Sequence, residues 1–475
     1  MIFKFSISQR SVSSLKKTAD QMSIIIIGAG EVGYHLAYRL SQEKKDVVVI
    51  DRDLDKIRRV QSTLDVQAIH GSGGSISLLR QAGISEAGMI IAVTNSDEVN
   101  MISCLVAGVQ DRVPIKIARV RDPEYSYLFP LFDKEHLDID FVINPDHEVV
   151  EMILKLMEVP GAVEVVDFAE GQLRMVGIPL SPESPLVGKT LAEIREMHPQ
   201  SNILIVAIQK GDRVFIPKGH NVLAANDLIF SVMPLKKTRE ALKIFGNNYT
   251  AIKRVMILGG GLIGLQLAKN LEEKGIQVKI IEPNEARCME IAEKCQKAIV
   301  LRGDATYQDI LLEENVSEMD VFIAVTEDDE DNVMISLLAK KMGTRRVMTL
   351  INKVAYSRLV HSIGIDVVIS PRLAAVNKIL QFIRRGKVLS VSSLPEENAE
   401  AFEVIALETS DLVGRPLREI KFPKEAIIGA LVRGAEVIIP DGSTVIQPGD
   451  RVMIFALTTA IPEVEKALMV KLEYW

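Results

Sequence analysis

A segment near the start of the chain is suited to binding phosphate groups. It reads GAGEVG from Gly28 to Gly33 and directly follows the apolar run Ile24–Ile27. Glycine permits the tight turn and the close backbone approach that a pyrophosphate requires, and the helix that begins there directs its free N–H groups toward the phosphates. Asp51 ends the next apolar run, where a carboxylate can accept hydrogen bonds from the ribose hydroxyls of an adenosine. Together these residues predict a nucleotide-binding site.

The same pattern occurs again in the second half of the chain. The segment GGGLIG runs from Gly259 to Gly264 and is followed by Glu282, and each of these residues lies 231 positions after its counterpart. Asp140 and Asp366 are only 226 positions apart, as expected where short insertions or deletions fall in surface loops. The chain is therefore an internal duplication, and each copy carries a complete candidate nucleotide site.

The acidic residue at each ribose position indicates which nucleotide these sites accept. The carboxylates of Asp51 and Glu282 repel a 2′-phosphate, which favours NAD(H), ATP or ADP over NADP. The neighbouring Arg52 and Arg302 carry the opposite charge and leave NADP open. The sequence therefore predicts NAD(H) as the cofactor, with ATP or ADP as the alternative.

Polar residues after the fourth and fifth predicted strands are further candidates. Thr94 and Asn95 follow the apolar run Met89–Val93, at the sheet edge where ligands of open α/β folds bind. Capping of the following helix is their alternative role. Arg119 and Arg121 follow the next run, and one of these guanidinium groups is suited to bind a phosphate.

The second half lacks this pair of arginines. Their counterparts are Leu350 and Asn352, so an arginine that senses ligand charge in the first site has no equivalent in the second. The acidic run Glu327–Asp331 follows the fourth predicted strand of this half. Its carboxylates suit a divalent ion, but a solvated first turn that complements the helix dipole is the favoured interpretation.

The elements that must position these residues follow a regular pattern in each half. Apolar runs of strand length, such as Val47–Ile50, alternate with amphipathic segments of helix length, such as Tyr34–Gln42 and Leu54–Leu64. This alternation predicts βαβ units around a parallel sheet. The fold class is therefore α/β, with two tandem doubly wound, Rossmann-like domains.

Short strands with hairpin turns follow each of these predicted domains. From about residue 163 the pattern changes to short alternating strands. Ile203–Gln209 is predicted to pair with Arg213–Pro217 in a hairpin, and in the second half Ile427–Val432 is predicted to pair with Glu436–Pro440. Each half thus ends in a small α+β domain. The predicted boundaries are 1–21 for an N-terminal extension or misplaced start, 22–144 and 253–369 for the nucleotide-binding domains, and 163–248 and 389–475 for the small domains.

Composition and missing motifs exclude several classes of protein. Hydrophobic residues make up 48% and charged residues 25%, as in ordinary globular proteins, and no apolar run is long enough for a membrane helix. The net charge of −7 gives no reason to expect nucleic-acid binding. No catalytic or metal-binding motif accompanies the glycine turns. We therefore expect a protein that is not an enzyme and binds no metal, with a soluble NAD-dependent oxidoreductase with a duplicated dinucleotide-binding domain as the alternative.

The order and spacing of these motifs resemble a known family. A glycine turn followed by Asp51, the segments AVTNSDE and ARVRDPEY, and a small domain with LVGKTL and PKGHNVLAANDLIF resemble an RCK (regulator of potassium conductance) unit. Two such units in one chain resemble the tandem-RCK regulatory subunits of Trk-type potassium uptake systems. The resemblance covers nearly everything from Met22 to the C-terminus.

The resemblance implies a function, partners and site residues. It implies a nucleotide-binding regulatory subunit that lies on the cytoplasmic face of the inner membrane. Copies of the chain are expected to assemble into a ring, with a tetramer as the expected form. This ring is expected to gate a membrane-embedded Trk-type potassium transport subunit. The expected nucleotide contacts of the two sites are Gly28, Ala29, Gly30, Glu31, Val32, Gly33, Asp51, Thr94, Asn95 and Arg119, and Gly259, Gly260, Gly261, Leu262, Ile263, Gly264 and Glu282.

Overall fold

The computed structural model divides into two compact units. It describes residues 23–127, 129–211, 213–247, 251–353, 356, 359–360, 363–383, 390–393 and 399–468. One unit comprises the chain up to Asp146 together with Arg372–Phe382, and the other comprises His147–Pro371 and the chain from Ile383 onward. The predicted N-terminal extension, 1–21, lies outside the described residues. None of the described helices is long and apolar enough to cross a membrane.

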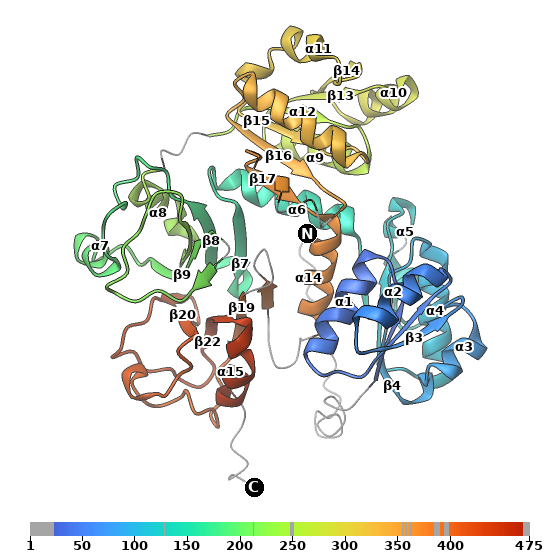
Figure 1. Cartoon of the computed structure of the whole chain (residues 1–475), viewed down its shortest axis with the longest axis horizontal. Coiled ribbons are helices and arrows are strands. Elements are labelled where there is room, and N and C mark those ends of the chain that lie inside the picture. Colours follow the sequence, from blue (N-terminus) through green and yellow to red (C-terminus); the bar gives the residue numbers. More distant parts are fainter. Residues whose placement is uncertain are drawn as a thin grey trace. The chain divides into compact units, whose positions relative to one another are not determined.

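The first unit is built on a parallel six-stranded sheet. Its strand order is β3-β2-β1-β4-β5-β6, so β1 and β4 lie at the centre. The sheet lies in the blue part of Figure 1, where β3 and β4 are labelled. Ile26 pairs with Val49 on one side and with Ile91 on the other, and all three are fully buried. This order confirms the predicted doubly wound fold. The strands are β1 (Ser23–Ile27), β2 (Val47–Asp51), β3 (Gln67–His70), β4 (Ala87–Ala92), β5 (Ile115–Arg119) and β6 (Phe141–Ile143).

The helices of this domain begin at the sheet edge where the predicted site residues lie. Gly30 precedes the first residue of α1, and the side chain of Asp53 caps α2 by accepting from the N–H groups of Asp55 and Lys56. The helices are α1 (Glu31–Gln42), α2 (Leu54–Thr63), α3 (Ile76–Gln81), α4 (Asp97–Asp111) and α5 (Pro123–Tyr127).

The second parallel sheet repeats the first. Its strand order is β14-β13-β12-β15-β16-β17, which is the same order in the corresponding elements and confirms the duplication. The strands are β12 (Arg254–Leu258), β13 (Gln277–Glu282), β14 (Ile299–Arg302), β15 (Val321–Ala324), β16 (Arg346–Leu350) and β17 (Val367–Ile369). The helices are α9 (Leu262–Glu273), α10 (Glu285–Lys294), α11 (Gln308–Glu313) and α12 (Asp329–Lys341).

Each small domain holds a five-stranded antiparallel sheet. The orders are β10-β9-β11-β8-β7 and β18-β19-β22-β20-β21. Both predicted hairpins are present, as β9 with β10 and as β20 with β21. The elements are β7 (Glu164–Phe168), β8 (Leu173–Pro179), β9 (Leu204–Lys210), β10 (Arg213–Phe215), β11 (Leu228–Pro234), α7 (Leu191–Met197) and α8 (Thr238–Ile244), then β18 (Ser390–Ser393), β19 (Ala399–Ile405), β20 (Ala426–Arg433), β21 (Glu436–Ile438), β22 (Arg451–Leu457) and α15 (Ile461–Leu468).

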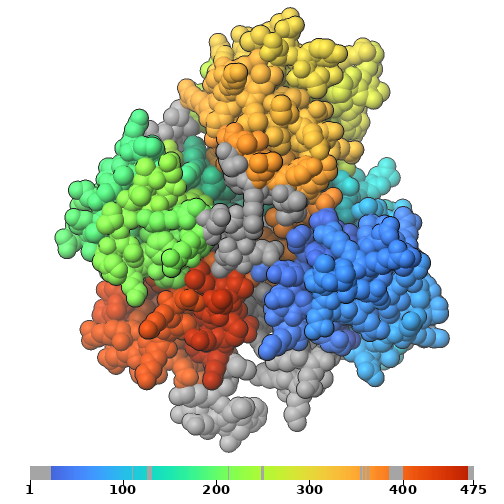
Figure 2. All heavy atoms as spheres, in the orientation of Figure 1, coloured from blue at the N-terminus to red at the C-terminus, as the bar shows by residue number. Residues whose placement is uncertain are grey.

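The two small domains share one hydrophobic core. Phe230 of β11 and Phe455 of β22 are fully buried, and their ring centroids are 6.3 Å apart. Ala399, Ala430 and Val432 belong to the same cluster. The two domains, green and red in Figure 2, therefore pack through sheet faces that would otherwise expose apolar side chains to water.

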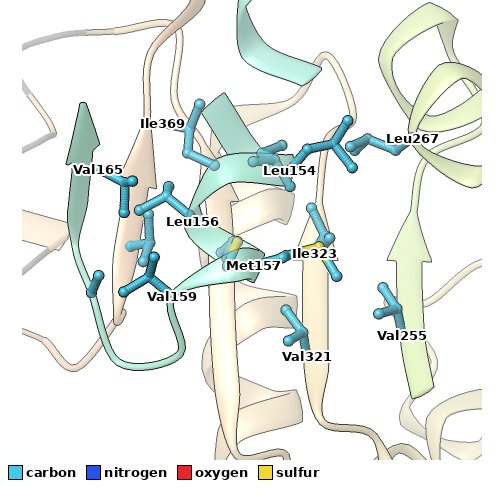
Figure 3. Close-up of a cluster of buried hydrophobic side chains, with 14 of the residues drawn as sticks. Leu154, Leu156, Met157, Val159, Val165, Val255, Leu267, Val321, Ile323 and Ile369 are labelled. Atoms are coloured by element: carbon cyan, nitrogen blue, oxygen red, sulfur yellow. The ribbon is translucent and has the colours of Figure 1, made fainter. Parts of the chain in front are cut away.

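One helix from each half packs with the other half. Helix α6 (Pro145–Glu158) follows β6 but packs against the second parallel sheet, where Leu154 joins Leu267 and Ile323 in one cluster (Figure 3). Helix α14 (Pro371–Ile383) follows β17 but belongs to the first unit. The sequence pattern predicted neither exchange, because an amphipathic helix shows which face it buries but not which sheet it covers.

A buried arginine fixes the end of α6. Arg346 of β16 donates to the carbonyl oxygen of Leu156 across 3.2 Å and also to the carbonyl oxygen of Ala162. Burial lowers the pKa of Arg346 to about 10, against a smaller opposing effect of Asp366. The guanidinium thus satisfies carbonyl groups at the C-terminal end of the helix, where the helix dipole favours a cation.

Candidate functional site

In the first glycine turn, the fold requires two of the three glycines but not the third. Gly28 has φ +106°, and a Cβ atom there would lie 3.1 Å from the backbone of Thr94. A Cβ atom on Gly33 would lie 1.8 Å from the carbonyl oxygen of Gly28. Gly30 has φ −65°, and a Cβ atom there would meet nothing within 4 Å. The fold therefore needs Gly28 and Gly33, whereas Gly30 leaves open space at the start of α1.

Asp51 is held against this turn. Its Oδ2 accepts from the N–H of Ala29 at 2.6 Å, and its Oδ1 accepts from the N–H of Asp53 at 2.8 Å. The carboxylate therefore lies beside the start of α1, although 22 residues separate Asp51 from Ala29. This is the position from which a carboxylate reaches the ribose of a nucleotide whose phosphates occupy the space before Gly30. The residues present thus fit the phosphates and ribose of a nucleotide.

A buried asparagine organises the adjacent loop. Asn100 is fully buried, and its Oδ1 accepts from the N–H of Thr94 at 2.9 Å and from its hydroxyl at 2.8 Å. Its Nδ2 donates to the carbonyl oxygen of Arg119 at 2.8 Å, which ties the ends of β4 and β5 together. Ser96, rather than Thr94 or Asn95, caps α4. The second half has an asparagine, Asn332, at the matching position. This repeat is the sequence signal that could have identified Asn100, although it does not reveal the role of the residue.

Arg119 and Arg121 have different environments. Arg121 donates to Asp146 through Nε at 3.1 Å and Nη2 at 2.9 Å, so its charge is already paired. Arg119 makes one long contact, from Nη1 to Oδ1 of Asn95 at 3.4 Å, and its buried Nε has no partner among the described residues. Burial, followed by the positive charge of Arg121, lowers the pKa of Arg119, although Asp146 and Asp97 oppose this. Arg119 is therefore the one of the two that is free to bind an anion.

A second cationic side chain lies at the first turn of α1. Arg59 of α2 donates to Oε1 of Glu31 at 2.7 Å and lies over the ring of Tyr34, 4.0 Å from its centroid. Glu31 occupies the first position of α1, where a free carboxylate would repel phosphate. The ion pair with Arg59 offsets this charge. Sequence reasoning did not identify Arg59, because no motif connects α2 with the glycine turn.

The second glycine turn has the same backbone but a different lining. Gly259 has φ +103°, and a Cβ atom on Gly264 would lie 2.0 Å from the carbonyl oxygen of Gly259. Gly261 again faces open space, and the N–H of Gly260 donates to Oε2 of Glu282 at 2.8 Å. The two turns therefore share the same glycine-dependent backbone geometry.

The second site differs in its cations. The counterpart of Arg119 is Leu350, which is buried. Arg287 of α10 donates from Nε to the carbonyl oxygen of Gly260 at 2.5 Å, and its buried Nη2 has no partner among the described residues. The cation at this site thus lies on the glycine turn itself rather than at the end of the fifth strand.

Carboxylates in the acidic run of the second half accept hydrogen bonds from backbone N–H groups. Asp328 caps α12 by accepting from the N–H of Asp331 at 2.8 Å. Asp329 is buried and accepts from the N–H groups of Asn352 and Lys353. Among the described residues, no group of three or more His, Cys, Asp or Glu side chains is placed to hold a metal ion. The run therefore forms the cap and first turn of α12, as interpreted, but the buried Asp329 shows that this turn is not wholly solvated as expected.

Comparison with known proteins identifies the family. The model of the TrkA-N domain matches residues 24–145 and 255–371, and that of the TrkA-C domain matches residues 175–246 and 401–469. The chain belongs to the TrkA family. Within this family, it is 41% identical over 458 residues to the Trk system potassium uptake protein TrkA of Halomonas elongata, covering 96% of this chain and 100% of the relative. It is 39% identical over 460 residues to the TrkA of Azorhizobium caulinodans, covering the same shares.

Solved structures of RCK domains share the fold of this TrkA family member. The RCK domain of GsuK aligns with a TM-score of 0.60 at 19% identity, covering 94% of this chain and 95% of that chain. The GsuK channel bound to NAD aligns with a TM-score of 0.60 at 18% identity, covering 94% and 79%. The family resemblance seen in the sequence is thus confirmed, and it places the chain with Trk potassium uptake proteins rather than with oxidoreductases.

Proposed function

We propose that this chain is the nucleotide-binding regulatory subunit of a Trk-type potassium uptake system. Its family supports a role in potassium uptake, because relatives that match over their whole length are named Trk system potassium uptake proteins. The partner is a membrane-embedded Trk-type transport subunit, and the chain binds it from the cytoplasmic side as a homo-oligomer, with a tetramer as the expected form.

One observation carries the nucleotide-binding part of this proposal. The open space before Gly30 lies at the same sheet edge as the carboxylate of Asp51 and the unpartnered Nε of Arg119. Free N–H groups and a cation suit the phosphates of a nucleotide, and a carboxylate suits its ribose hydroxyls. NAD(H) is the favoured ligand, with ATP or ADP as the alternative, and the NAD-bound structure of GsuK supports this choice.

The regulatory step requires only that the ligand prefers one shape of the assembly. A nucleotide that binds one conformation of the ring more tightly than another shifts the free-energy difference between the two conformations. The shift is about 1.4 kcal/mol for each tenfold ratio of affinities. Exchange of NADH for NAD, or of ATP for ADP, changes the charge in the site, and Arg119 is the unpaired cation positioned to respond. The change in ring shape is transmitted to the pore of the membrane subunit.

Calorimetry on the purified chain tests the binding part directly. We expect saturable binding of NAD(H) or of ADP and ATP with at least one site per chain. Absence of binding by all of these nucleotides would overturn the proposal. Co-purification of the chain with a polytopic potassium-transporting protein from solubilised membranes tests the partner, and failure to recover such a protein would contradict this part of the proposal.

A further inference from the structure

The first small domain and the end of α6 form a cavity of about 340 Å³. Its lining comes from β8, from the segment Leu235–Lys237, from α8 and from the last residue of α6; β8 and α8 lie in the green domain of Figure 1. None of the described lining residues belongs to a glycine turn, so the cavity is separate from both proposed nucleotide sites. Its volume lies within the range of pockets that hold small molecules. The lining residues that determine its chemistry are Glu158, Arg174, Leu235, Lys236, Arg239 and Leu242.

One of these side chains is a buried arginine. Arg174 of β8 is 6% exposed, and it donates from Nε to Asp167 at 2.6 Å and from Nη2 to Glu158 at 3.1 Å. Its Nη1 donates to no described residue and keeps contact with solvent. Two of the three guanidinium nitrogens therefore fix the side chain, and the third can donate to a molecule in the cavity.

The two carboxylates that hold Arg174 are themselves shared with lysines. Oδ2 of Asp167 lies 3.7 Å from Nζ of Lys155, and Oε1 of Glu158 lies 3.8 Å from Nζ of Lys274. This network thus contains three cations and two carboxylates. Its own acidic residues do not neutralise it, and a positive charge remains beside the cavity.

Two further cationic side chains line the cavity. Lys236 and Arg239 are both exposed, and Lys236 forms no ion pair with a described residue. Glu158 is the one carboxylate among the described lining residues, against three cations. Leu235 and Leu242 add apolar surface. The lining therefore combines guanidinium and ammonium groups, which suit phosphate oxygens, with room for the organic part of a ligand.

The second small domain forms the same fold without these cations. Strand β19 follows β8 by 226 positions in the repeat, so Arg174 corresponds to Glu400. Lys236 and Arg239 lie two and five residues after the end of β11, where Thr459 and Pro462 follow β22. The five-stranded sheet forms in both copies. The small-domain fold therefore does not require the three cations, which are a feature of the first copy alone.

We propose that this cavity is an anion-binding site, distinct from the two glycine turns, that takes a small phosphate-bearing molecule. Nη1 of Arg174 and Nζ of Lys236 bind the phosphate oxygens. Because Glu158 is the last residue of α6, a ligand in the cavity contacts the small domain and also the helix that packs on the second parallel sheet. The site goes beyond the proposed function and does not depend on nucleotide binding at the glycine turns.

Calorimetric titration of inorganic pyrophosphate into the full chain tests this inference. We expect saturable binding, and we expect Lys236→Glu to weaken it at least tenfold because a carboxylate replaces one of the cations. Lys243→Glu is the matched control: it reverses the charge of an exposed lysine of α8 that does not line the cavity, and the affinity should stay as in the unchanged protein. Where Lys236→Glu does not fold, Lys236→Gln gives the same readout with a smaller loss.

Hydrogen exchange locates the bound pyrophosphate, since the glycine turns also suit phosphate groups. We expect protection of the backbone amides of Leu235–Leu242 in the unchanged protein and in Lys243→Glu, but not in Lys236→Glu. No binding of pyrophosphate, equal affinities in the two variants, or protection of the glycine turns alone would overturn the inference. If pyrophosphate binds as expected while NAD(H), ATP and ADP do not bind, the proposed function fails and this inference stands.

Discussion

The N–H of Ala29 donates a hydrogen bond to Oδ2 of Asp51 across 2.6 Å, and the N–H of Gly260 donates to Oε2 of Glu282 across 2.8 Å. In both halves, therefore, the carboxylate that ends the second strand is bonded directly to the glycine turn. Under the proposed function, this hydrogen bond holds the proposed ribose acceptor against the proposed phosphate-binding turn in one arrangement. Such preorganisation lowers the entropic cost of binding.

Replacement of Asp51 tests this arrangement. We expect Asp51→Ala to weaken nucleotide binding at least tenfold, because the ribose loses its acceptor and the turn loses the partner of its Ala29 N–H. Asp55→Ala is the control, since the side chain of Asp55 on α2 is 90% exposed and its removal should leave binding unchanged. If calorimetry gives the same nucleotide affinity for the Asp51 variant as for the unchanged protein, the assignment of Asp51 to the ribose position is wrong.

Substitutions of two glycines in the first turn should affect stability and nucleotide binding differently. Gly30→Ala meets no atom within 4 Å, so we expect the free energy of unfolding to change by less than about 0.5 kcal/mol while nucleotide binding falls at least tenfold. Gly33→Ala places a Cβ atom 1.8 Å from a backbone oxygen and should cost about 2–4 kcal/mol of stability. Chemical denaturation and calorimetry on both variants check this, and a Gly30 variant that binds normally would contradict it.

Substitutions at Arg119 and Arg121 should have opposite effects on stability. Arg119→Leu introduces the residue found at position 350 and removes a buried, unpartnered Nε, so we expect about 1 kcal/mol higher stability together with at least tenfold weaker ATP binding. Arg121→Leu leaves the buried carboxylate of Asp146 without its cation and should cost about 3 kcal/mol. Denaturation curves of the free protein and calorimetry distinguish the two. A loss of stability in Arg119→Leu would argue against an unsatisfied arginine.

The glycine turns, the alternating elements and the duplication were predictable from the sequence because they depend on local pattern. The pairing of Asp51 with the turn was also predictable, since the carboxyl ends of neighbouring parallel strands meet at one edge. The contact of Arg59 with Glu31 was not, because no motif connects α2 with the glycine turn. The placement of α14 was not either, because an amphipathic pattern does not show which sheet a helix covers. The residue pattern alone left Arg119 and Arg121 as equal candidates, and the family resemblance favoured Arg119. The ion pair between Arg121 and Asp146 is a structural reason for the same choice.

Glu164 of β7 should make stability depend on pH. Burial raises its pKa to about 7, and no ion pair or side-chain hydrogen bond joins its carboxylate to another described residue. Because the folded state binds this proton more tightly than the unfolded state, stability should fall as pH rises from about 4.5 to about 7 and then level off.

Glu164→Gln removes this dependence. Allowing for the partial exposure of the side chain, we expect the variant to gain about 1–2 kcal/mol relative to the unchanged protein between pH 5 and pH 8. Glu183→Gln, at an exposed position of the same small domain, provides the control. Urea denaturation at several pH values measures the effect. Parallel pH profiles for the Glu164 variant and the unchanged protein would rule out an uncharged buried carboxyl.

Potassium flux through the reconstituted system tests the central claim most directly. The chain is combined with the Trk membrane subunit of the same organism in proteoliposomes, and flux is measured as NADH, NAD, ATP or ADP is titrated. We predict that at least one of these nucleotides changes the flux saturably, and that Asp51→Ala shifts the midpoint at least tenfold. Flux that does not respond to any of the nucleotides, with the chain bound to its partner, would contradict the account.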